Sequence, residues 1–246
     1  MSMSLYPIPG FPALWIESLK VLVIADLHIG IENELRDQGV QVSSHTYQMK
    51  KNLIQICEKY RPRDIFIIGD IKHSIPATPF FEKKELNDFL SDLSRFALIH
   101  IIPGNHDGGI NYLISEEIIT HSSEGYILDN IGFVHGHRWP KKTVLQCDYL
   151  IMGHSHPTIL LKDRLGFQNF EPCWIKTGLN KIQAKKMYSA FNDDITAIIL
   201  PAFNRLCGGI AVNRDALLGP LRKIIDLDHA AVFLLDGTHL GMVKEI

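Results

Sequence analysis

Five short apolar runs of strand type each end directly in a small group of polar residues, and this pattern constrains the fold more than any other feature. The runs are VLVIA, DIFII, ALIHIIP, IGFV and DYLIM. The polar groups that follow them are Asp26-Leu27-His28, Gly69-Asp70, Gly104-Asn105-His106-Asp107, His135-Gly136-His137 and Gly153-His154-Ser155-His156. Because runs rich in β-branched residues and bounded by turn residues are typical of strands, we expect five strands whose ends present these side chains. Five rigid edges in one domain could converge on a single cluster.

Two segments with helical periodicity separate the first three runs. Thr46–Tyr60 has apolar residues at helical spacing and is ended by Arg61-Pro62, and Phe80–Phe96 is the second segment. Glu82 falls among the polar positions of that second helix. Strands that alternate with helices indicate βαβ units, so we expect a largely parallel sheet in this half.

The second half of the chain, after Gly109, has a different pattern. Strand-type segments follow at short intervals at Tyr126–Leu128, Gly132–His135, Tyr149–Met152, Ile159–Leu161, Cys173–Thr177, Ile195–Leu200 and Val232–Leu235. One helix is expected near Asp215–Ile225, where Gly219-Pro220 opposes it. This half therefore favours a mixed or antiparallel sheet.

Both halves fit one α/β domain over residues 1–246. Two mixed sheets packed face to face, each backed by helices, would form a four-layer α-β-β-α sandwich. The motifs lie within residues 21–157, and strands from residues 158–246 would complete the sandwich. Residues 1–20 are expected to be a short lead-in whose prolines prevent a long helix. No internal repeat or Gly/Ser linker indicates a second domain.

Composition and charge narrow the class of protein. Of the 246 residues, 46% are apolar and 21% are charged, which is typical of a folded globular protein. No apolar run is long enough to span a bilayer and the N-terminus lacks a secretory signal, so we expect a cytoplasmic protein without membrane contact. The formal net charge of −2 excludes a global basic field. Any contact with nucleic acid must use a local patch such as Lys141-Lys142.

The four cysteines, Cys57, Cys147, Cys173 and Cys207, are scattered along the chain and form no CxxC pair. Buried free thiols in a reducing compartment explain them better than disulfides or a zinc knuckle. None of the four belongs to the five polar motifs.

The side-chain types in the motifs point to metal chemistry. Carboxylate, imidazole and amide groups, with no thiolate among them, suit Mn²⁺, Fe²⁺, Zn²⁺ or similar ions. Two such ions about 3.5–4 Å apart can clamp the attacking and leaving oxygens of a displacement at phosphorus. A carboxylate with two oxygens can bridge the pair, and Asp70 is the candidate. The spacing of two in Asp26-x-His28 and His154-x-His156 lets both side chains of each pair serve one bimetal site.

The ordered pattern DxH, GD, GNHD, H and GHxH resembles that of the calcineurin-like metallophosphoesterase superfamily, over residues 21 to about 157. Each short motif occurs by chance in many proteins, but five in order at strand ends form a specific signature. The resemblance implies the four-layer metallophosphoesterase fold and hydrolysis of phosphate esters. It implies a cofactor of two divalent metal ions, with Mn²⁺ expected and Fe²⁺, Zn²⁺ or Ni²⁺ as alternatives.

The resemblance also implies roles for individual residues. The first metal would be bound by Asp26, His28 and His156, Asp70 would bridge, and the second metal would be bound by Asn105, His135 and His154. A hydroxide bridging the metals would attack phosphorus. His106 would contact the phosphate and protonate the leaving oxygen, and Asp107 would orient His106 and favour its protonated form.

A narrower resemblance covers nearly the whole chain. Residues 69–74 (GDIKHS), residues 200–204 (LPAFN), Gly208-Gly209 and the tail through Gly241 are similar to archaeal and bacterial phosphoesterases related to the SbcD nuclease. This similarity implies a phosphodiester substrate such as single-stranded nucleic acid, and a DNA-repair helicase or ATPase as partner. One departure is His73, which stands where many superfamily members have an acid three residues after the second-motif Asp. Its role is either to support a ligand or to contact the substrate.

Several residues beside the motifs leave alternatives open. His137 could replace His135 as the ligand, since the two share a face of an extended chain. Arg138 could contact a substrate phosphate, or it could pack a loop over the sheet together with Trp139. A solvated helical face is expected at Glu32, Glu34 and Arg36.

The leading functional hypothesis is a dinuclear-metal-dependent phosphodiesterase or nuclease that acts on DNA or RNA. The neutral overall charge favours an alternative, a phosphohydrolase of a small phosphate ester or nucleotide. A second alternative is an inactive metallophosphoesterase-fold scaffold, which the full set of expected ligands opposes. The sequence gives no indication of the oligomeric state.

Overall fold

The computed structural model describes residues 4–40 and 42–246. The first half of the chain forms a six-stranded sheet. The strands in sheet order are β1 (Leu5–Pro7), β2 (Leu14–Ile16), β3 (Val21–Ala25), β4 (Asp64–Ile68), β5 (Leu98–Ile102) and β6 (Ile119–Thr120). Strands β3 to β6 are parallel, as expected, whereas β1 and β2 pair antiparallel. The lead-in expected over residues 1–20 thus carries two strands, although residues 1–3 of it lie outside the described part.

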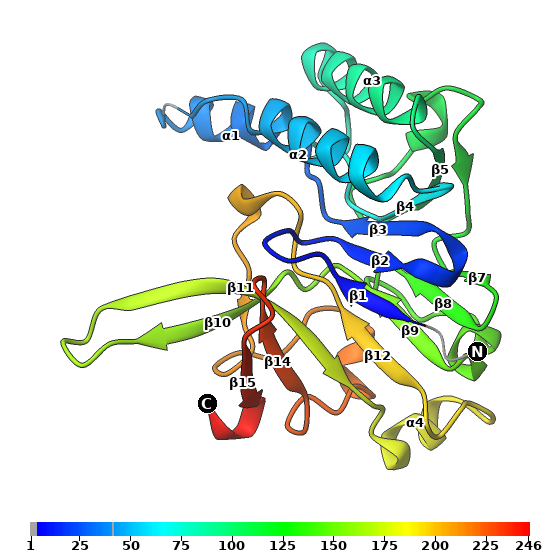
Figure 1. Ribbon diagram of the computed structural model, residues 1–246, viewed down its shortest axis with the longest axis vertical. Helices are drawn as coiled ribbons and strands as arrows, with labels where there is room; N and C mark the ends of the chain where they lie inside the picture. The colour runs from blue at the N-terminus through cyan, green and yellow to red at the C-terminus, as the bar shows by residue number, and fades with distance from the viewer. Residues whose placement is uncertain (1–3, 41) are drawn as a thin grey trace.

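Helices cover the outer face of this first sheet (Figure 1). They are α1 (Ile31–Asp37), α2 (His45–Tyr60) and α3 (Phe80–Ser94). The two helices predicted from periodicity are therefore confirmed as α2 and α3. Helix α2 begins where the Ser44 side chain accepts a hydrogen bond from the Tyr47 amide, and it ends where Arg61 turns left-handed at φ 49°. Leu53 and Phe89 on the inner faces of α2 and α3 pack in one apolar cluster with Ile67 of β4.

The second half of the chain forms a mixed sheet. Its main path is β13-β10-β11-β12-β9-β8-β7; β14 pairs with β11, and β15 pairs with β14. The bounds are β7 (Tyr126–Leu128), β8 (Ile131–Val134), β9 (Tyr149–Met152), β10 (Pro157–Lys162), β11 (Gln168–Thr177), β12 (Thr196–Ile199), β13 (Ile210–Ala211), β14 (Ala231–Leu234) and β15 (His239–Met242). All seven strands expected here are confirmed, while the short β13 and β15 are additional.

The expected helix near Asp215–Ile225 is wrong. Only a 3₁₀ turn forms there, at Pro220–Lys223, because Gly219 has φ 71° and Pro220 lacks an amide donor. The helix of this half is instead α4 (Lys181–Met187), which begins where the Asn180 side chain accepts from the Gln183 amide. Further 3₁₀ turns lie at Glu17–Leu19, Ile110–Tyr112, Lys142–Gln146, Arg205–Cys207 and Val243–Glu245.

The two sheets pack face to face, which gives the expected four-layer arrangement (Figure 1). Val23 and Phe66 of the first sheet share a buried cluster with Phe133 and Trp174 of the second. The outer face of the second sheet is covered by a thin layer of α4 and 3₁₀ turns, where Ala184 and other apolar residues are buried. Among the described residues, no helix combines the length and apolar character needed to cross a bilayer.

Candidate metal centre

The strand ends that carry the motifs are aligned. Ala25, Ile68 and Ile102 are register partners across β3, β4 and β5, so the first three motifs leave the sheet at one edge. In the second sheet, Val134 of β8 pairs with Met152 of β9, and the last two motifs start at the same level. Parallel strands present their carboxyl ends on one side, and this topology explains why motifs far apart in sequence meet.

The backbone is strained at the motif residues. Among the described residues other than glycine, eight have positive φ, and five of these are Asp26, His28, Asp70, His154 and His156. Their φ values lie between 41° and 71°, a region that non-glycine residues rarely adopt. Strained residues of this kind cluster at functional sites, where the surrounding structure holds them. The turns aim the polar side chains of both sheets into one space.

Three motif glycines are required by close packing against the polar side chains. A Cβ at Gly69 would lie 2.2 Å from His135 Nδ1, and one at Gly104 would lie 2.2 Å from Asp70 Oδ1. A Cβ at Gly153 would lie 2.9 Å from Asp26 Oδ2. The glycines of these motifs therefore make room for the carboxylates and imidazoles that converge here.

The converging side chains form two groups that share one carboxylate. The first group is Asp26, His28, Asp70 and His156, and the second is Asp70, His135 and His154. Within each group the ligand atoms lie within 4.8 Å of one another. Asp70 Oδ2 lies 3.6 Å from His28 Nε2 and 3.3 Å from His135 Nε2. The grouping of side chains is the one that the family resemblance implied, with Asp70 common to both.

Two further contacts complete the cluster. Asn105 Oδ1 lies 3.2 Å from His135 Nε2, so the amide oxygen adjoins the second group. His156 Nε2 lies 3.3 Å from Asp26 Oδ1 in the first group. All seven side chains predicted as ligands therefore meet at one place.

The donor atoms fit a metal centre. His135 Nδ1 bonds to the Ile68 carbonyl at 3.1 Å, which leaves its Nε2 facing the shared carboxylate. His28 Nε2 and His156 Nε2 are buried and have no hydrogen-bond partner among the described residues. A buried polar atom without a partner costs free energy, and a cation between these nitrogens would satisfy both.

The electrostatics of the cluster favour a cation. Burial would lower the pKa of His135, but its hydrogen bond to Asp70 and the charges of Asp26 and Asp70 raise it to about 9. Burial lowers the pKa of His28 to about 3 although both carboxylates attract its proton. Burial would raise the pKa of Asp70, but the hydrogen bond and charge of His135 hold it well below its usual range. Asp70 is therefore ionised and attracts positive charge.

His106 lies beside the first group and is oriented by backbone. Its amide donates to Asp70 Oδ1 at 2.9 Å, and its Nδ1 lies 2.5 Å from the His73 carbonyl oxygen. The rings of His106 and His28 meet edge to face at 4.7 Å. Because a carbonyl oxygen only accepts, Nδ1 of His106 carries a proton, and Nε2 is the nitrogen left for a substrate.

Asp107 differs from the expectation that it orients His106. Its carboxylate accepts hydrogen bonds from the backbone amides of Gly104 at 2.8 Å, Ile71 at 2.9 Å and Lys72 at 3.3 Å. No hydrogen bond joins it to the His106 ring in the part of the chain that the structure describes. Asp107 instead ties the second motif to the third, and the His73 carbonyl orients His106.

His73 bridges the cluster and helix α1. Its Nδ1 lies 3.3 Å from His28 Nδ1, and its Nε2 lies 2.5 Å from Glu34 Oε2. Since His28 Nδ1 is engaged in this contact, its Nε2 is the atom that faces Asp70. His73 thus supports a ligand histidine, one of the two roles left open by the sequence.

His137 and Arg138 lie outside the two groups. The His137 ring is 5.3 Å from the His135 ring and 6.2 Å from the His154 ring, measured between centroids. Its Nε2 accepts a hydrogen bond from Arg138 Nε at 3.1 Å. The first histidine of the pair, His135, is therefore the one that reaches the shared carboxylate.

Two acids were misplaced by sequence reasoning. Glu82, expected at one of the polar positions of its helix, is fully buried and accepts hydrogen bonds from the His73 amide at 3.0 Å and the Ser74 amide at 2.9 Å. Glu32, expected on a solvated face, is buried and accepts from the His45 amide at 2.6 Å and the Thr46 amide at 2.9 Å. Each acid satisfies backbone donors, and helical periodicity carries no signal for such contacts.

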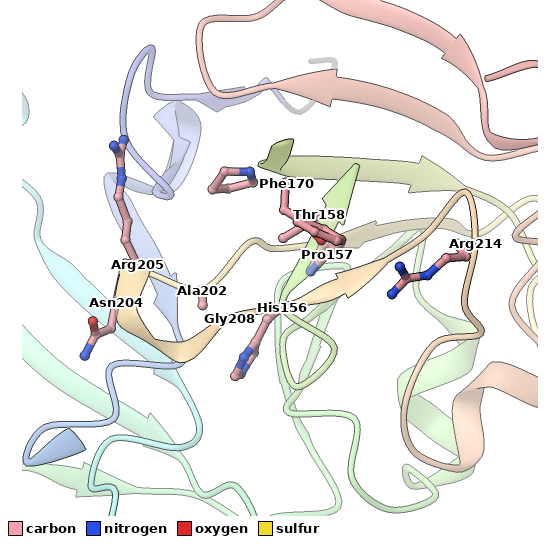
Figure 2. Close-up of a pocket in the computed structure, with 11 residues that line it drawn as sticks. His156, Pro157, Thr158, Phe170, Ala202, Asn204, Arg205, Gly208 and Arg214 are labelled. Carbon is pink, nitrogen blue, oxygen red and sulfur yellow. The ribbon is translucent and has the colours of Figure 1, made fainter. Parts of the chain in front are cut away.

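A pocket of about 380 Å³ adjoins the first group at His156 (Figure 2). Arg205 and Arg214 lie on opposite sides of it, and Phe170 of β11 is a third lining residue. The Arg214 guanidinium lies 5.6 Å from the centre of the Phe170 ring and also pairs with Asp215 at 2.9 Å. The pocket therefore combines an aromatic face with two cations beside the cluster.

The chain is similar in sequence to known proteins. The model of the calcineurin-like phosphoesterase family matches residues 19–158. Serine/threonine-protein phosphatase CPPED1 of Danio rerio is 29% identical over 103 residues, which are 39% of this chain and 33% of that protein. The chain thus spans about a third of that curated relative's length.

Among solved structures, the fold resembles that of the Pseudomonas putida nuclease MPE. The TM-score is 0.60 at 18% identity, with 96% of this chain and 98% of that chain covered. The E. coli phosphoesterase Yfce is more distant, with a TM-score of 0.42 at 12% identity over 90% of this chain and 96% of that chain.

Proposed function

The chain belongs to the calcineurin-like phosphoesterase family of metal-dependent enzymes, and we propose that it uses two divalent metal ions to hydrolyse phosphodiester bonds in nucleic acid. The observation that carries this proposal is the pair of side-chain groups that share Asp70. One carboxylate common to two groups of imidazoles and carboxylates is the arrangement that a two-metal hydrolase requires.

The residues would divide between two metal positions. Asp26, His28 and His156 would hold the first ion, Asn105, His135 and His154 the second, and Asp70 both. The ions would supply Lewis acidity and a water nucleophile with a lowered pKa. Mn²⁺ is the proposed native ion, and oxygen and nitrogen ligands of this kind also suit Fe²⁺, Zn²⁺ or Ni²⁺.

His106 would act on the leaving group. The His73 carbonyl fixes the ring through Nδ1, so that Nε2 is free to hold and donate a proton. The carboxylate of Asp70, the shared ligand, accepts a hydrogen bond from the His106 amide and so holds the third motif close to itself. His106 would protonate the departing oxygen, while Asp107 keeps the two loops in place.

The pocket at His156 supports a nucleotide-containing substrate. Stacking on an aromatic face is a sequence-tolerant way to bind a base, and arginines bind phosphate in bidentate fashion. Phe170 supplies the aromatic face and Arg205 the cation next to the first metal position, while Arg214 is paired with Asp215. A volume of about 380 Å³ lies in the range of small-molecule sites, which suits one nucleoside unit beside the scissile bond.

The narrower likeness to SbcD-related phosphoesterases leads us to propose single-stranded DNA as the substrate, a role in DNA repair, and a helicase or ATPase as partner. The nuclease MPE of Pseudomonas putida, whose fold is similar, is a nuclease by name. The second candidate function, hydrolysis of a small phosphate ester or nucleotide, is favoured by the net charge of −2. Retention of all seven ligand side chains opposes an inactive scaffold.

The test compares three substrates with one preparation. Protein freed of metal with a chelator and reloaded with Mn²⁺ is offered single-stranded DNA, a bis-aryl phosphodiester and an aryl phosphomonoester. We expect cleavage of both diesters, no activity before reloading, and slower turnover of the monoester. Activity on the monoester alone would eliminate the diesterase proposal in favour of the small-ester function.

A further inference from the structure

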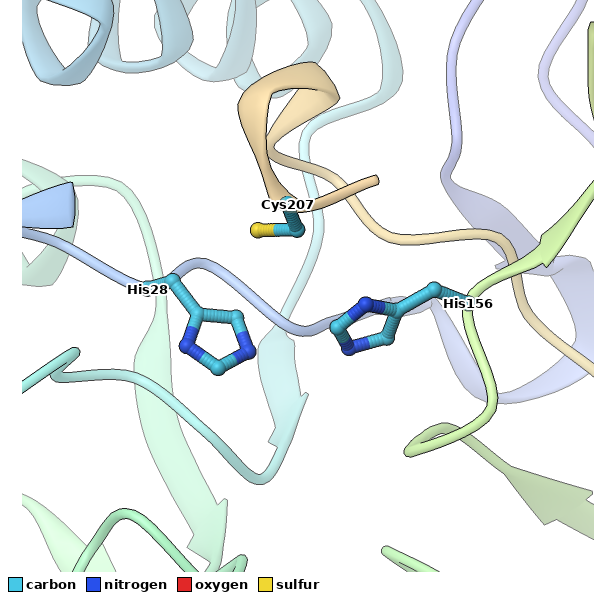
Figure 3. Close-up of side chains that lie close together, drawn as sticks. All are labelled: His28, His156 and Cys207. Atoms are coloured by element: carbon cyan, nitrogen blue, oxygen red, sulfur yellow. The ribbon is translucent and has the colours of Figure 1, made fainter. Parts of the chain in front are cut away.

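We propose that the Cys207 thiol is an additional ligand at the first metal position, which makes this position a mixed oxygen, nitrogen and sulfur site. Cys207 Sγ and one ring nitrogen each of His28 and His156 lie within 4.8 Å of one another. Figure 3 shows Cys207 above the two imidazole rings. No cysteine belongs to the polar motifs, so residue spacing does not predict a thiol at this place. The proposal rests on the metal centre but not on the nuclease activity.

The segment that carries Cys207 is fastened to the first motif. Phe203 donates its amide to the Ala25 carbonyl at 2.9 Å, and the Asn204 amide donates to the Asp26 carbonyl at 3.3 Å. The fully buried Asn204 side chain donates to the Leu27 carbonyl at 2.8 Å and accepts from the Leu206 amide at 3.0 Å. Cys207 is therefore held in a fixed position relative to His28.

The histidine nitrogens supply a second, independent indication. The His28 side chain is about nine-tenths buried or more, and its Nε2 has no hydrogen-bond partner among the described residues. His156 Nε2 is also buried and without a partner in the same described ranges. Both imidazoles that share a group with the Cys207 thiol thus keep one buried nitrogen without a hydrogen-bond partner, and a metal ion bound to the group would satisfy these nitrogens.

The other cysteines have different surroundings. Cys57 packs in the apolar cluster under α2 and α3, and Cys173 is buried in the apolar cluster of the second sheet. Cys147 donates to the Thr143 carbonyl with a sulfur–oxygen distance of 3.8 Å. These three thiols agree with the expectation that the cysteines are buried and free. Cys207 alone among the four joins a group of potential metal ligands in the described chain.

Ligation by Cys207 would release a proton and would change which metal ions the first position prefers. The thiol binds as thiolate, so one proton passes to water for each ion bound at this position. Thiolate is a soft ligand that strengthens binding of Zn²⁺, Fe²⁺ or Co²⁺ more than that of Mn²⁺. The first position would therefore select a softer ion than the second, and the two positions would differ in occupancy when metals compete.

Cobalt spectroscopy tests the proposal directly. Metal-free protein is titrated with Co²⁺, and wild type is compared with Cys207→Ser and with the control Cys147→Ser. We expect visible d–d bands together with a near-ultraviolet thiolate-to-cobalt charge-transfer band in wild type and the control. Cys207→Ser should keep d–d bands and lose the charge-transfer band. Its Zn²⁺ affinity should fall by about tenfold or more, because even partners outside the ligand shell contribute that much, while its Mn²⁺ affinity changes little.

The contradicting results separate this proposal from the proposed function. Cobalt d–d bands without a charge-transfer band in wild type, or a charge-transfer band that persists in Cys207→Ser, would overturn thiol ligation alone. The absence of any cobalt band would overturn the metal centre as well. X-ray absorption of the zinc-loaded wild type needs no variant: a sulfur scatterer at bonding distance supports the proposal, and an oxygen and nitrogen shell alone refutes it.

Discussion

At the scale of single residues, parallel strand topology brings the polar side chains together, and the turns that follow the strands decide what each side chain contacts. Asp26, His28 and Asp70 follow strand runs directly, so their convergence follows from parallel topology. Asp107 was expected at His106 and instead binds the Gly104 and Ile71 amides. The direction of a side chain in a tight turn depends on that turn's dihedral angles, and residue spacing does not contain them.

Replacement of His106 by alanine should separate catalysis from metal binding. His106 contacts the shared Asp70 through its backbone amide, which alanine keeps, so His106→Ala should retain bound Mn²⁺. Diester hydrolysis should fall by roughly 10²–10⁴, the usual contribution of a proton donor in the transition state. Turnover and metal content are measured on the same sample, with His229→Ala as control because His229 contacts Asp226 far from the motifs. Loss of metal from His106→Ala would refute the proposed role.

Gly69 should not tolerate a side chain. Its φ is 73°, and a Cβ would lie 2.2 Å from His135 Nδ1 and 2.9 Å from Gly104 Cα. Gly69→Ala should lower the free energy of unfolding by about 1–3 kcal/mol and weaken metal binding at the His135 position. Gly108→Ala is the matched control, since a Cβ at Gly108 has no described atom within 4 Å. The unfolding free energy in urea and the metal affinity are measured for both variants. If Gly69→Ala and Gly108→Ala change these quantities equally, close packing at Gly69 is not the cause.

At the scale of elements, the sequence patterns identified α2, α3 and ten strands but not the elements that depend on distant partners. Helix α4 has seven residues with three lysines, and its apolar side is too short to give a clear period. Strands β13 and β15 have two and four residues and exist because neighbours pair with them. Helix α3 contributes more than packing, since buried Glu82 bonds to the loop that carries His73.

Glu82 should therefore link the stability of α3 to the geometry of the site. Its carboxylate accepts from the His73 and Ser74 amides and from Ser74 Oγ. Glu82→Ala leaves these donors unpaired and should cost about 1.5–3 kcal/mol of unfolding free energy, with reduced hydrolysis because the His73 carbonyl no longer fixes His106. Lys84→Ala, on the exposed side of α3, is the control. If both variants behave like wild type in urea unfolding and turnover, Glu82 does not hold this loop.

At the scale of the whole molecule, the two facing sheets could be predicted from the sequence. The contact of residues 203–207 with the first motif could not. Asn204 bonds to Leu27 across 177 positions of sequence and places residues 203–207 beside the first motif. No local pattern encodes such a contact. An aromatic stack also joins the sheets: Phe66 lies 4.5 Å from His100, and His121 lies 3.8 Å from Tyr126, measured between ring centroids.

This stack makes stability depend on pH. Burial, together with the charge of His100, lowers the pKa of His121 to about 4, compared with 6.5 in the unfolded chain. The unfolded state binds the His121 proton more tightly than the folded state does. The stability associated with neutral His121 is therefore fully present above pH 6.5 and is lost as the pH falls toward 4. Urea midpoints at about pH 7 and pH 5 should differ less for His121→Phe than for wild type. The control His229→Gln should keep the wild-type difference between the two urea midpoints. If His121→Phe also keeps the wild-type difference, His121 is not the source of the pH dependence.

We propose a pair of metal ions joined by Asp70, and the metal content of the folded protein tests for this pair directly. The protein is loaded with Mn²⁺, freed of unbound metal by gel filtration and analysed for manganese per chain, with near-ultraviolet circular dichroism to verify folding. We expect two ions in wild type, two in the control Asp129→Ala, whose strained aspartate lies outside the cluster, and less than one in Asp70→Ala. Wild-type protein that retains no more than one ion, or Asp70→Ala that retains both, would contradict a pair of ions joined by Asp70.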